Sequence, residues 1–328
     1  MVRCAAKIIM LLLIVLCLVL SGCSNNGQKP NIQDINIALQ HEPYKLDPYY
    51  AETRAERQVF QSIFDKLVNV DERGNIIAEL ADAWDISADG KVYTFYLHKG
   101  VKFHDGTLFN AEAVKFNLER YQESGIHQGL QFVSNIEVVD EYVVRLFLDK
   151  PFTPLLYVLA DKSGMMCSPA AVRSHGVQFM NSPVGTGPYI FKTRVRGNSV
   201  TLSANTHYWR EGEPAADSLT YKIIPNEKTA LVNLRSGMID LSEHFPLEEL
   251  KNYAQHEKVA VKNTLGTNFT GIVLNLTQKP FHDERVRQAV NLLIDKKMLV
   301  ELLKIEQYVN MALQYVRCLL YTSPSPRD

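Results

Sequence analysis

Residues 79–106, ELADAWDISADGKVYTFYLHKGVKFHDG, decide the fold class of this chain. Their segment 87–90 (SADG) is typical of a turn between two extended runs. The second run, residues 92–97 (VYTFYL), is β-branched and aromatic, a composition that favours a β-strand. The segment 104–106 (HDG) turns the chain again before a helical pattern begins. The stretch therefore predicts two paired strands that lead into a helix.

The helix that follows is expected to be amphipathic. Asn110 can cap its N-terminus, and Glu112 lies in the first turn, where negative charge is favourable. Val114, Leu118 and Tyr121 give the helix one apolar face. Strands and helices are interspersed along the rest of the chain, which predicts a mixed α/β fold. Further strands are expected at 34–39, 136–148 (a hairpin), 199–204, 218–224, 239–241 and 271–276, and further helices at 57–68, 168–172, 228–237, 283–293 and 295–317, with a loop at 41–50.

The N-terminus has the pattern of a secretory signal. Arg3 and Lys7 precede an apolar run at 8–20, which is short for a membrane span and typical of a signal-peptide core. The run ends in Leu-Ser-Gly-Cys, which resembles a bacterial lipobox with Cys23 as the acylated residue. The alternative is an ordinary signal peptide with a cysteine by chance. We expect a lipoprotein signal peptide at 1–22, lipidation of Cys23 and a flexible tether at 23–31.

Composition and charge exclude some classes of protein. The 328 residues are 46% hydrophobic and 22% charged with a formal net charge of −1, which is ordinary for a soluble protein of two domains. Because Lys and Arg are not in excess, nucleic acid is not an expected partner. Among the five cysteines, only Cys167 lies outside the signal, the lipobox and the C-terminal tail, so no internal disulfide is expected. Its apolar neighbours predict a buried, unreactive thiol.

Signatures of catalytic chemistry are missing from the sequence. Residues 185–188 (GTGP) do not form a dinucleotide loop, because Ile190 stands where the third glycine is needed. The sequence contains no phosphate-binding P-loop and no G-x-S-x-G motif. No two of the nine histidines lie within five positions of each other, which argues against a metal pair on one helix or hairpin. We therefore predict no catalytic residue, no metal and no cofactor, and we place His98 and His104 on the surface.

Three blocks of sequence together resemble one family. The first comprises residues 80–106 and the helical FNAEAVKFNLERY at 109–121. The second, 168–209, includes SPAAV, SPVGTGPYIF and HYW, and the third is KPFHDERVRQAVNLLIDKKMLV at 279–300. In this order the blocks are similar to the extracellular solute-binding proteins, family 5, of peptide and nickel ABC importers. The family is not an enzyme family, which agrees with the missing catalytic motifs.

The resemblance implies a periplasmic-binding-protein-like fold of the α/β class, with two lobes (type II, cluster C) that close on a ligand. Residues 32–69 and 182–267 would form the ligand-facing subdomain of lobe I, and residues 70–181 its smaller subdomain. Lobe II would start at 268–317 and be incomplete. The apolar face of its helix at 283–293 points inward and is formed by Val286, Ala289, Val290 and Leu293. Because the lobe would be unfinished, we expect Val286, Val290 and Leu293 to be exposed in this chain.

The resemblance also implies where ligand binds. First-lobe contacts of the family cluster in the loop after the first strand, here 41–54, and where the chain crosses between the lobes. The substrate-binding residues implied are Tyr49, Tyr50, Glu52, Thr53, Asn268 and Phe269. Alternatively, Tyr49 and Tyr50 are half-buried loop residues, and Glu52 or Arg54 pairs with another surface charge instead of a ligand terminus. Trp84, Phe95 and Phe103 are implied to be core residues.

The implied function is that of a substrate-binding lipoprotein of an ABC importer. It would act as a monomer in the bacterial cell envelope, lipid-anchored and facing the periplasm or the extracellular side. There it would capture short peptides and deliver them to the permease, whose ATPase subunits supply energy. Within the family, the alternatives are a nickel chelate, glutathione or an opine. Nickel ranks lower, because nickel-type members carry an arginine near the position of Met165. Outside it, the alternatives are a membrane-tethered hydrolase and a sensor of peptide signals.

The C-terminal tail, CLLYTSPSPRD at 318–328, does not continue the helical pattern before it. One back-translation of this segment resembles a transposase adapter used to prepare sequencing libraries. We therefore expect a non-native tail on a truncated gene fragment. The alternative is a genuine short variant of the family.

Overall fold

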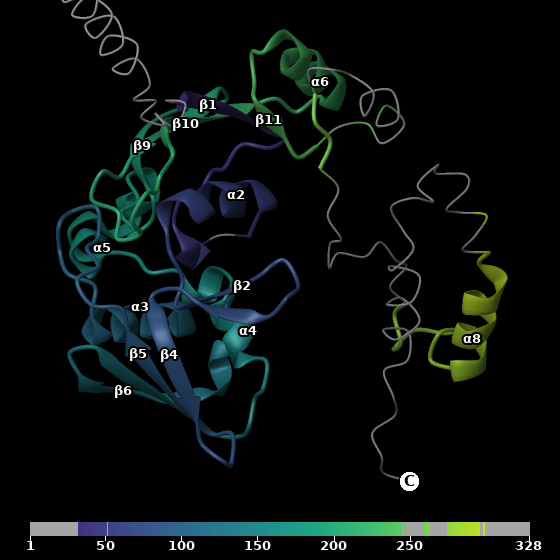
Figure 1. Ribbon diagram of the computed structural model, residues 1–328. Helices are drawn as coiled ribbons and strands as arrows, with labels where there is room; N and C mark the ends of the chain where they lie inside the picture. Colours follow the sequence, from purple (N-terminus) through teal and green to yellow (C-terminus); the bar gives the residue numbers. More distant parts are fainter. Residues whose placement is uncertain are drawn as a thin grey trace, which may run out of the picture. The chain divides into compact units, whose positions relative to one another are not determined.

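The computed structural model describes residues 32–50, 52–244, 246, 249, 259–262, 274–295 and 298 (Figure 1). The predicted signal peptide, Cys23, the tether, Asn268, Phe269, most of the helix predicted at 295–317 and the tail lie outside these residues. The predictions on them, and the predicted subdomain boundaries, therefore stay predictions.

The described elements are interspersed strands and helices, as predicted. The strands are β1 (Ile32–Leu39), β2 (Val68–Val70), β3 (Ile76–Ala78), β4 (Ala81–Ile86), β5 (Val92–Leu97), β6 (Val133–Asp140), β7 (Val143–Leu148), β8 (Tyr189–Val195), β9 (Ser199–Ala204), β10 (Ala216–Ile223) and β11 (Leu241–Ser242). The α-helices are α2 (Arg54–Ile63), α3 (Ala111–Ser124), α4 (Leu155–Leu159), α5 (Pro169–His175), α6 (Glu227–Ser236) and α8 (Glu284–Leu293). The 3-10 helices are η1 (Pro48–Tyr50), η2 (Leu130–Phe132), η3 (Lys162–Gly164) and η4 (Gly176–Asn181).

The chain divides into two compact units. The first comprises Met1–Ile37 and His41–Ile223, and the second comprises Ala38–Gln40 and Ile224–Asp328. In the second unit, Ala38, Ala230 and Ile239 form a small buried cluster. The strands of one sheet follow the order β11-β1-β10-β9-β8.

The opening stretch of the sequence lies at the centre of the first unit. β4 and β5 pair antiparallel in a four-stranded sheet of order β4-β5-β7-β6, and α3 lies against this sheet (Figure 1). The apolar face of α3 joins the sheet in the largest buried cluster, and Phe95 and Phe103 belong to it. Trp84 is partly buried and packs against it. The core assignment of these three aromatic residues is confirmed.

Helix caps account for several boundaries that the sequence predicts. The side chain of Asn110 accepts a hydrogen bond from the N–H of Ala113 and caps α3. The side chain of Ser168 caps α5 in the same way, and Gly237 ends α6 in the left-handed conformation. The helix predicted at 57–68 is α2, and both of its predicted ends are wrong. Thr53 and Glu56 form a capping box that begins the helix at Arg54, and the helix ends at Ile63, because Phe64 is already extended.

The predictions in the second unit are confirmed in part. Leu241 lies in the predicted short strand, β11, whereas Ile239 is buried in the small cluster and lies before that strand. Within the predicted strand 271–276, the described residues 274–276 form a loop and a turn, so this part of the prediction is wrong. Asp283 caps α8 as predicted. No side chain of α8 is buried and Leu293 is 83% exposed, which agrees with the exposed face expected for the incomplete lobe. A helix face becomes buried only where another element packs on it, and no described residue does so here.

Gly185 and Gly187, in the loop before β8, pack against the end of α2. The N–H of Gly187 donates to the carbonyl of Ile63, the last residue of α2, at 2.9 Å. A Cβ at Gly187 would lie 2.6 Å from the carbonyl carbon of Ile63, and one at Gly185 would lie 2.1 Å from its oxygen. Only glycine permits this approach, which fixes the C-terminal end of α2.

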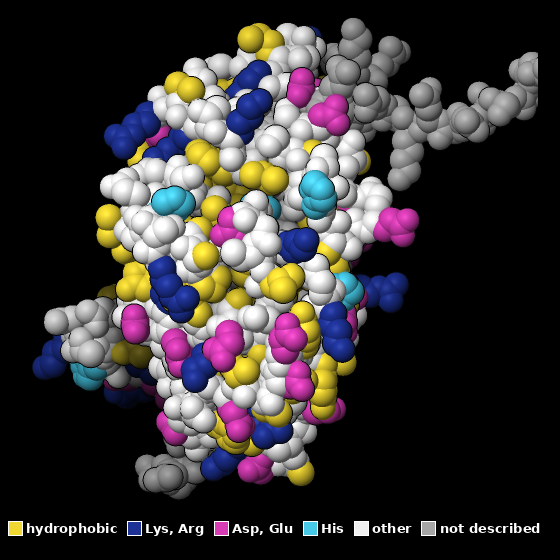
Figure 2. Space-filling view, turned by 90° about the vertical axis from the view of Figure 1, so that its left-hand side faces the viewer, with side chains coloured by type: hydrophobic (Ala, Val, Ile, Leu, Met, Phe, Trp, Pro, Cys, Tyr) yellow, Lys and Arg dark blue, Asp and Glu magenta, His cyan; other side chains and the backbone are white. Residues whose placement is uncertain are grey.

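The surface shows charges of both signs. On the face of the described part shown in Figure 2, Lys, Arg, Asp and Glu side chains are interspersed. Within the described part of the chain, no helix is long and apolar enough to cross a membrane.

Candidate functional site

The candidate site is the loop 41–54 between β1 and α2, where the predicted residues Tyr49, Tyr50, Glu52 and Thr53 lie in sequence. Tyr49 and Tyr50 are half-buried in η1, and their rings meet edge to face at 4.5 Å. Glu52 and Thr53 are exposed at the N-terminus of α2. The structure therefore brings four of the six predicted residues to one short surface segment.

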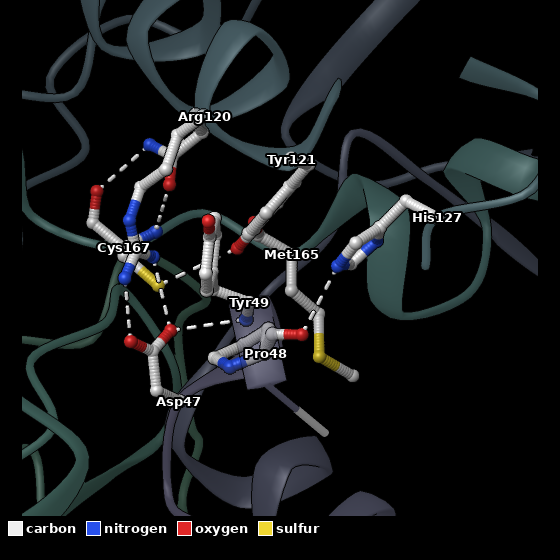
Figure 3. A network of polar contacts seen from close by, with 9 residues as sticks. Asp47, Pro48, Tyr49, Arg120, Tyr121, His127, Met165 and Cys167 are labelled. Carbon is white, nitrogen blue, oxygen red and sulfur yellow. Dashed lines mark hydrogen bonds and ion pairs between the residues drawn. The ribbon is translucent and has the colours of Figure 1, made fainter. Parts of the chain in front are cut away.

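A buried ion pair fixes the centre of this loop (Figure 3). The carboxylate of Asp47, 1% exposed, accepts hydrogen bonds from Nη1 and Nη2 of Arg120 on α3 at 3.0 and 2.5 Å. Its Oδ1 also accepts the backbone N–H of Tyr49 at 3.0 Å. Although burial acts to lower the pKa of Arg120, its hydrogen bonds to Asp47 contribute to a pKa above the ordinary range. The guanidinium therefore stays charged, and its two parallel hydrogen bonds to the carboxylate favour one orientation of the turn.

A buried histidine holds the same turn from the other side. Nε2 of His127 lies 3.1 Å from the carbonyl oxygen of Pro48, and Nδ1 lies 2.9 Å from Oγ of Ser163. Because the Pro48 carbonyl can only accept, Nε2 carries the proton and Nδ1 accepts from Ser163. Burial, with help from the positive charge of Lys162, lowers the pKa of His127 to about 4. The imidazole is therefore neutral at pH 7 and stacks on the ring of Tyr121 at 4.4 Å.

A second buried carboxylate satisfies the loop's backbone donors. Glu56 is 2% exposed, and its two oxygens accept hydrogen bonds from the backbone N–H groups of Lys45, Glu52 and Thr53, each at 3.0 Å. In return, Oγ1 of Thr53 accepts the N–H of Glu56 at 3.3 Å. The oxygen of the Thr53 hydroxyl thus has a structural partner, and its proton is left for another acceptor.

The layer behind the loop is buried and unreactive. The hydroxyl of Tyr121 donates to the carbonyl of Met165 at 2.8 Å, and the side chain of Asn117 bonds to both backbone groups of Cys167 (Figure 3). Cys167 is a buried free thiol, as predicted, and burial raises its pKa. Met165 is 2% exposed, so its side chain belongs to the core.

The exposed rim of the loop carries both charges. Glu52 and Lys45 form a long ion pair of 3.9 Å; the side chain of Glu52 is largely exposed and that of Lys45 is half-exposed. Such a pair contributes little to stability and can exchange its partner for a ligand charge. Arg54 is exposed beside it. The rim therefore carries one acidic and two basic side chains in the same loop as Tyr50.

The surface prediction for His104 is wrong. His104 is half-buried: its Nε2 donates to the carbonyl of Gly187 at 2.9 Å, and its Nδ1 accepts the N–H of Gly185 at 3.3 Å. Burial lowers the pKa of His104, so it acts as a neutral link between two loops. His98 is partly exposed and pairs with Asp82, which agrees with a surface position.

Four residues that hold the loop were not predicted from the sequence: Asp47, Glu56, Arg120 and His127. The pattern Thr53-x-x-Glu56 is a capping-box signature and could have identified Glu56. Asp47 and Arg120 are 73 positions apart, and nothing in either local pattern links them. Within the described ranges, no group of three or more His, Cys, Asp or Glu residues is placed to hold a metal ion.

Comparison with known proteins identifies the family. Residues 75–312 match the bacterial extracellular solute-binding proteins, family 5 Middle. The chain belongs to this family. It is also 35% identical over 273 residues to the glutathione-binding protein GsiB of Pectobacterium atrosepticum, a match that covers 82% of this chain and 53% of the relative. The chain thus spans about half the length of the curated relatives that it matches.

Solved structures of the family share the fold. The periplasmic binding protein DppA of Helicobacter pylori, in complex with the peptide STSA, matches with a TM-score of 0.74 and 26% identity over 85% of this chain and 60% of that one. NikZ of Campylobacter jejuni, in complex with Ni(L-His), matches with a TM-score of 0.67 and 26% identity over 86% and 56%. The predicted α/β fold of the periplasmic-binding-protein type is confirmed.

Proposed function

We propose that the complete gene product is the substrate-binding lipoprotein of an ABC importer and captures short peptides, with glutathione as the first candidate. It would work outside the membrane as a monomer and deliver its ligand to the permease with its ATPase subunits. The observation that carries the proposal is family membership over residues 75–312, together with a relative named as a glutathione-binding protein. Glutathione is itself a small peptide, so the two descriptions name one ligand class.

The loop 41–54 supports this ligand class. Short peptides carry an amino group, a carboxylate and a backbone with free donors and acceptors. The rim offers Glu52 for the amino end, Lys45 or Arg54 for a carboxylate, and the half-buried rings of Tyr49 and Tyr50 for side chains. We propose these residues, with Asn268 and Phe269, as ligand contacts.

A nickel chelate is the second candidate, since a similar structure holds Ni(L-His). One observation favours peptides over a nickel chelate. The side chain of Met165, which we expected where nickel-type members carry arginine, lies in the core.

The test is ligand-dependent stabilisation of the complete gene product. A ligand that binds only the folded state at about 100 times its Kd adds roughly 2.7 kcal/mol to the unfolding free energy. We expect this rise in Tm with glutathione or a tripeptide, and a smaller one or none with nickel–histidine. No rise with any peptide, glutathione, opine or nickel chelate at millimolar concentration would contradict the proposal.

The lipid anchor has its own test. We propose that Cys23 is acylated and holds the protein on the outer side of a bacterial membrane. Expressed in a bacterial host, Cys23→Ser is expected to move the protein from the membrane to the soluble fraction. Equal membrane retention of the variant would refute acylation at this residue.

A further inference from the structure

The side chain of Arg120 extends from α3 to the candidate binding loop. Its side chain is 14% exposed, and that of its partner Asp47 is 1% exposed. Both hydrogen bonds of its guanidinium go to Asp47, so this side chain holds the loop and not its own helix. Arg120 is too deep to meet a ligand itself.

The guanidinium lies close to two aromatic rings. It is 4.6 Å from the ring centroid of Tyr49 and 5.9 Å from that of Phe179 on η4. Cation–π attraction is strongest where the cation is desolvated, as here. Arg120 therefore fixes both the backbone of the turn, through Asp47, and the ring of the first predicted contact residue.

The Arg120 contact is the central one of several restraints on this loop. Arg194 donates from Nη1 to the carbonyl of Tyr44 at 2.9 Å, and the N–H of Leu46 donates to the carbonyl of Met180 at 3.1 Å. His127 and Glu56 hold Pro48 and the residues after η1, as described above. The Asp47 carboxylate binds Tyr49 of η1 and Arg120 of α3 at once, and so ties the turn to this helix.

We propose that Arg120 is a positioning residue for ligand binding: through Asp47 and the ring of Tyr49, it holds the loop in one conformation before the ligand arrives. The proposal rests on the proposed function. A loop that is already ordered loses less conformational entropy on binding, so the ligand binds more tightly. Lysine cannot replace this role, because a single ammonium lacks the planar fork.

The decisive experiment separates affinity from stability with three variants of the complete gene product. Arg120→Met leaves Asp47 buried without its partner, so it lowers both Tm and affinity. The double variant Asp47→Asn with Arg120→Met removes the buried charges together, which often restores stability. Asn117→Ala is the matched control, because Asn117 lies one turn earlier on α3, is fully buried and bonds to Cys167 and Ala113 instead of the loop.

Glutathione is the probe. We expect the double variant to regain most of the Tm that Arg120→Met loses, while its Kd stays about tenfold or more above the wild-type value. Asn117→Ala is expected to lower Tm and keep the wild-type Kd within about twofold. The proposal fails if Kd in the double variant recovers along with Tm, or if Asn117→Ala weakens binding as much.

Hydrogen exchange decides the positioning role without any ligand. The N–H groups of Tyr49 and Tyr50 donate to the side chain and backbone oxygens of Asp47. We expect both amides to exchange about tenfold faster or more in the double variant and in Arg120→Lys, and at the wild-type rate in Asn117→Ala. Unchanged exchange would overturn the proposal. If wild type itself does not bind glutathione or any other peptide, the proposed function fails, and the exchange rates alone then decide the role of Arg120.

Discussion

The buried carboxylate of Glu56 is expected to contribute strongly to the stability of the loop. Glu56→Gln keeps the size of the side chain but replaces one acceptor oxygen with an NH₂ group. Since one oxygen accepts Lys45 and the other accepts Glu52 and Thr53, the amide must face at least one backbone N–H. The variant therefore loses hydrogen bonds and places two donors against each other.

The magnitude follows from those contacts. Hydrogen bonds to a charged group contribute about 1.5–3 kcal/mol each, and an unsatisfied buried donor costs about 1–3 kcal/mol. Glu52 and Thr53 are exposed, so water can replace part of their loss, whereas Lys45 is only half-exposed. We expect Glu56→Gln to lower the unfolding free energy by about 2–4 kcal/mol. At about 2–4 °C per kcal/mol for a unit of this size, Tm falls by roughly 5–15 °C.

The control is Glu112→Gln. Glu112 also lies in the first turn of a helix, α3, but it is exposed. The Glu112→Gln variant loses only the interaction of this charge with the helix dipole, which contributes about 0.3–1 kcal/mol to the unfolding free energy. Urea unfolding of both variants measures the difference. If Glu56→Gln is no more destabilising than Glu112→Gln, the view that a buried carboxylate organises the loop is refuted.

Four further predictions concern other buried residues. Burial raises the pKa of Glu79 from 4.5 to about 7, so its contribution to stability is full below pH 4.5 and is lost as pH rises to 7. His127 has the opposite sign, because its stabilisation is full above pH 6.5 and is lost as pH falls toward 4. The unfolding free energy of wild type minus that of Glu79→Gln should thus fall between pH 5 and 8. The same difference against His127→Gln should rise between pH 4 and 6.5. A difference that does not change with pH would contradict the pKa given for that residue. Gly187→Ala brings a Cβ to 2.6 Å from Ile63 and should cost about 3 kcal/mol or more in urea unfolding, and a cost below about 1 kcal/mol would refute the close packing. Cys167 should resist a thiol reagent in native protein and react only on unfolding, so rapid native labelling would contradict its burial.

Local sequence signals predict local structure well in this chain. The β-branched run 92–97 is β5, and the caps at Asn110, Ser168 and Gly237 mark helix ends. These signals work because caps and strand propensity act over a few residues. The error at the start of α2 came from reading apolar spacing alone and missing the capping box.

Long-range partners could not be predicted in the same way. His104 lies in a segment, 104–106, whose composition is typical of a surface turn. Its hydrogen-bond partners Gly185 and Gly187 come more than 80 positions later. The site loop was located from family resemblance, whereas the residues that hold it depend on the packing of α3 behind it. The apolar face predicted for α8 needs an element to cover it, and no described residue provides one.

Calorimetric titration of the complete gene product with glutathione and a tripeptide tests whether the protein binds short peptides through the loop 41–54. The account predicts saturable binding at a single site, and about tenfold or greater weakening in Tyr50→Ala, since a half-buried aromatic contact is worth more than about 1 kcal/mol. Binding of neither ligand, or equal affinity in wild type and Tyr50→Ala, would contradict it.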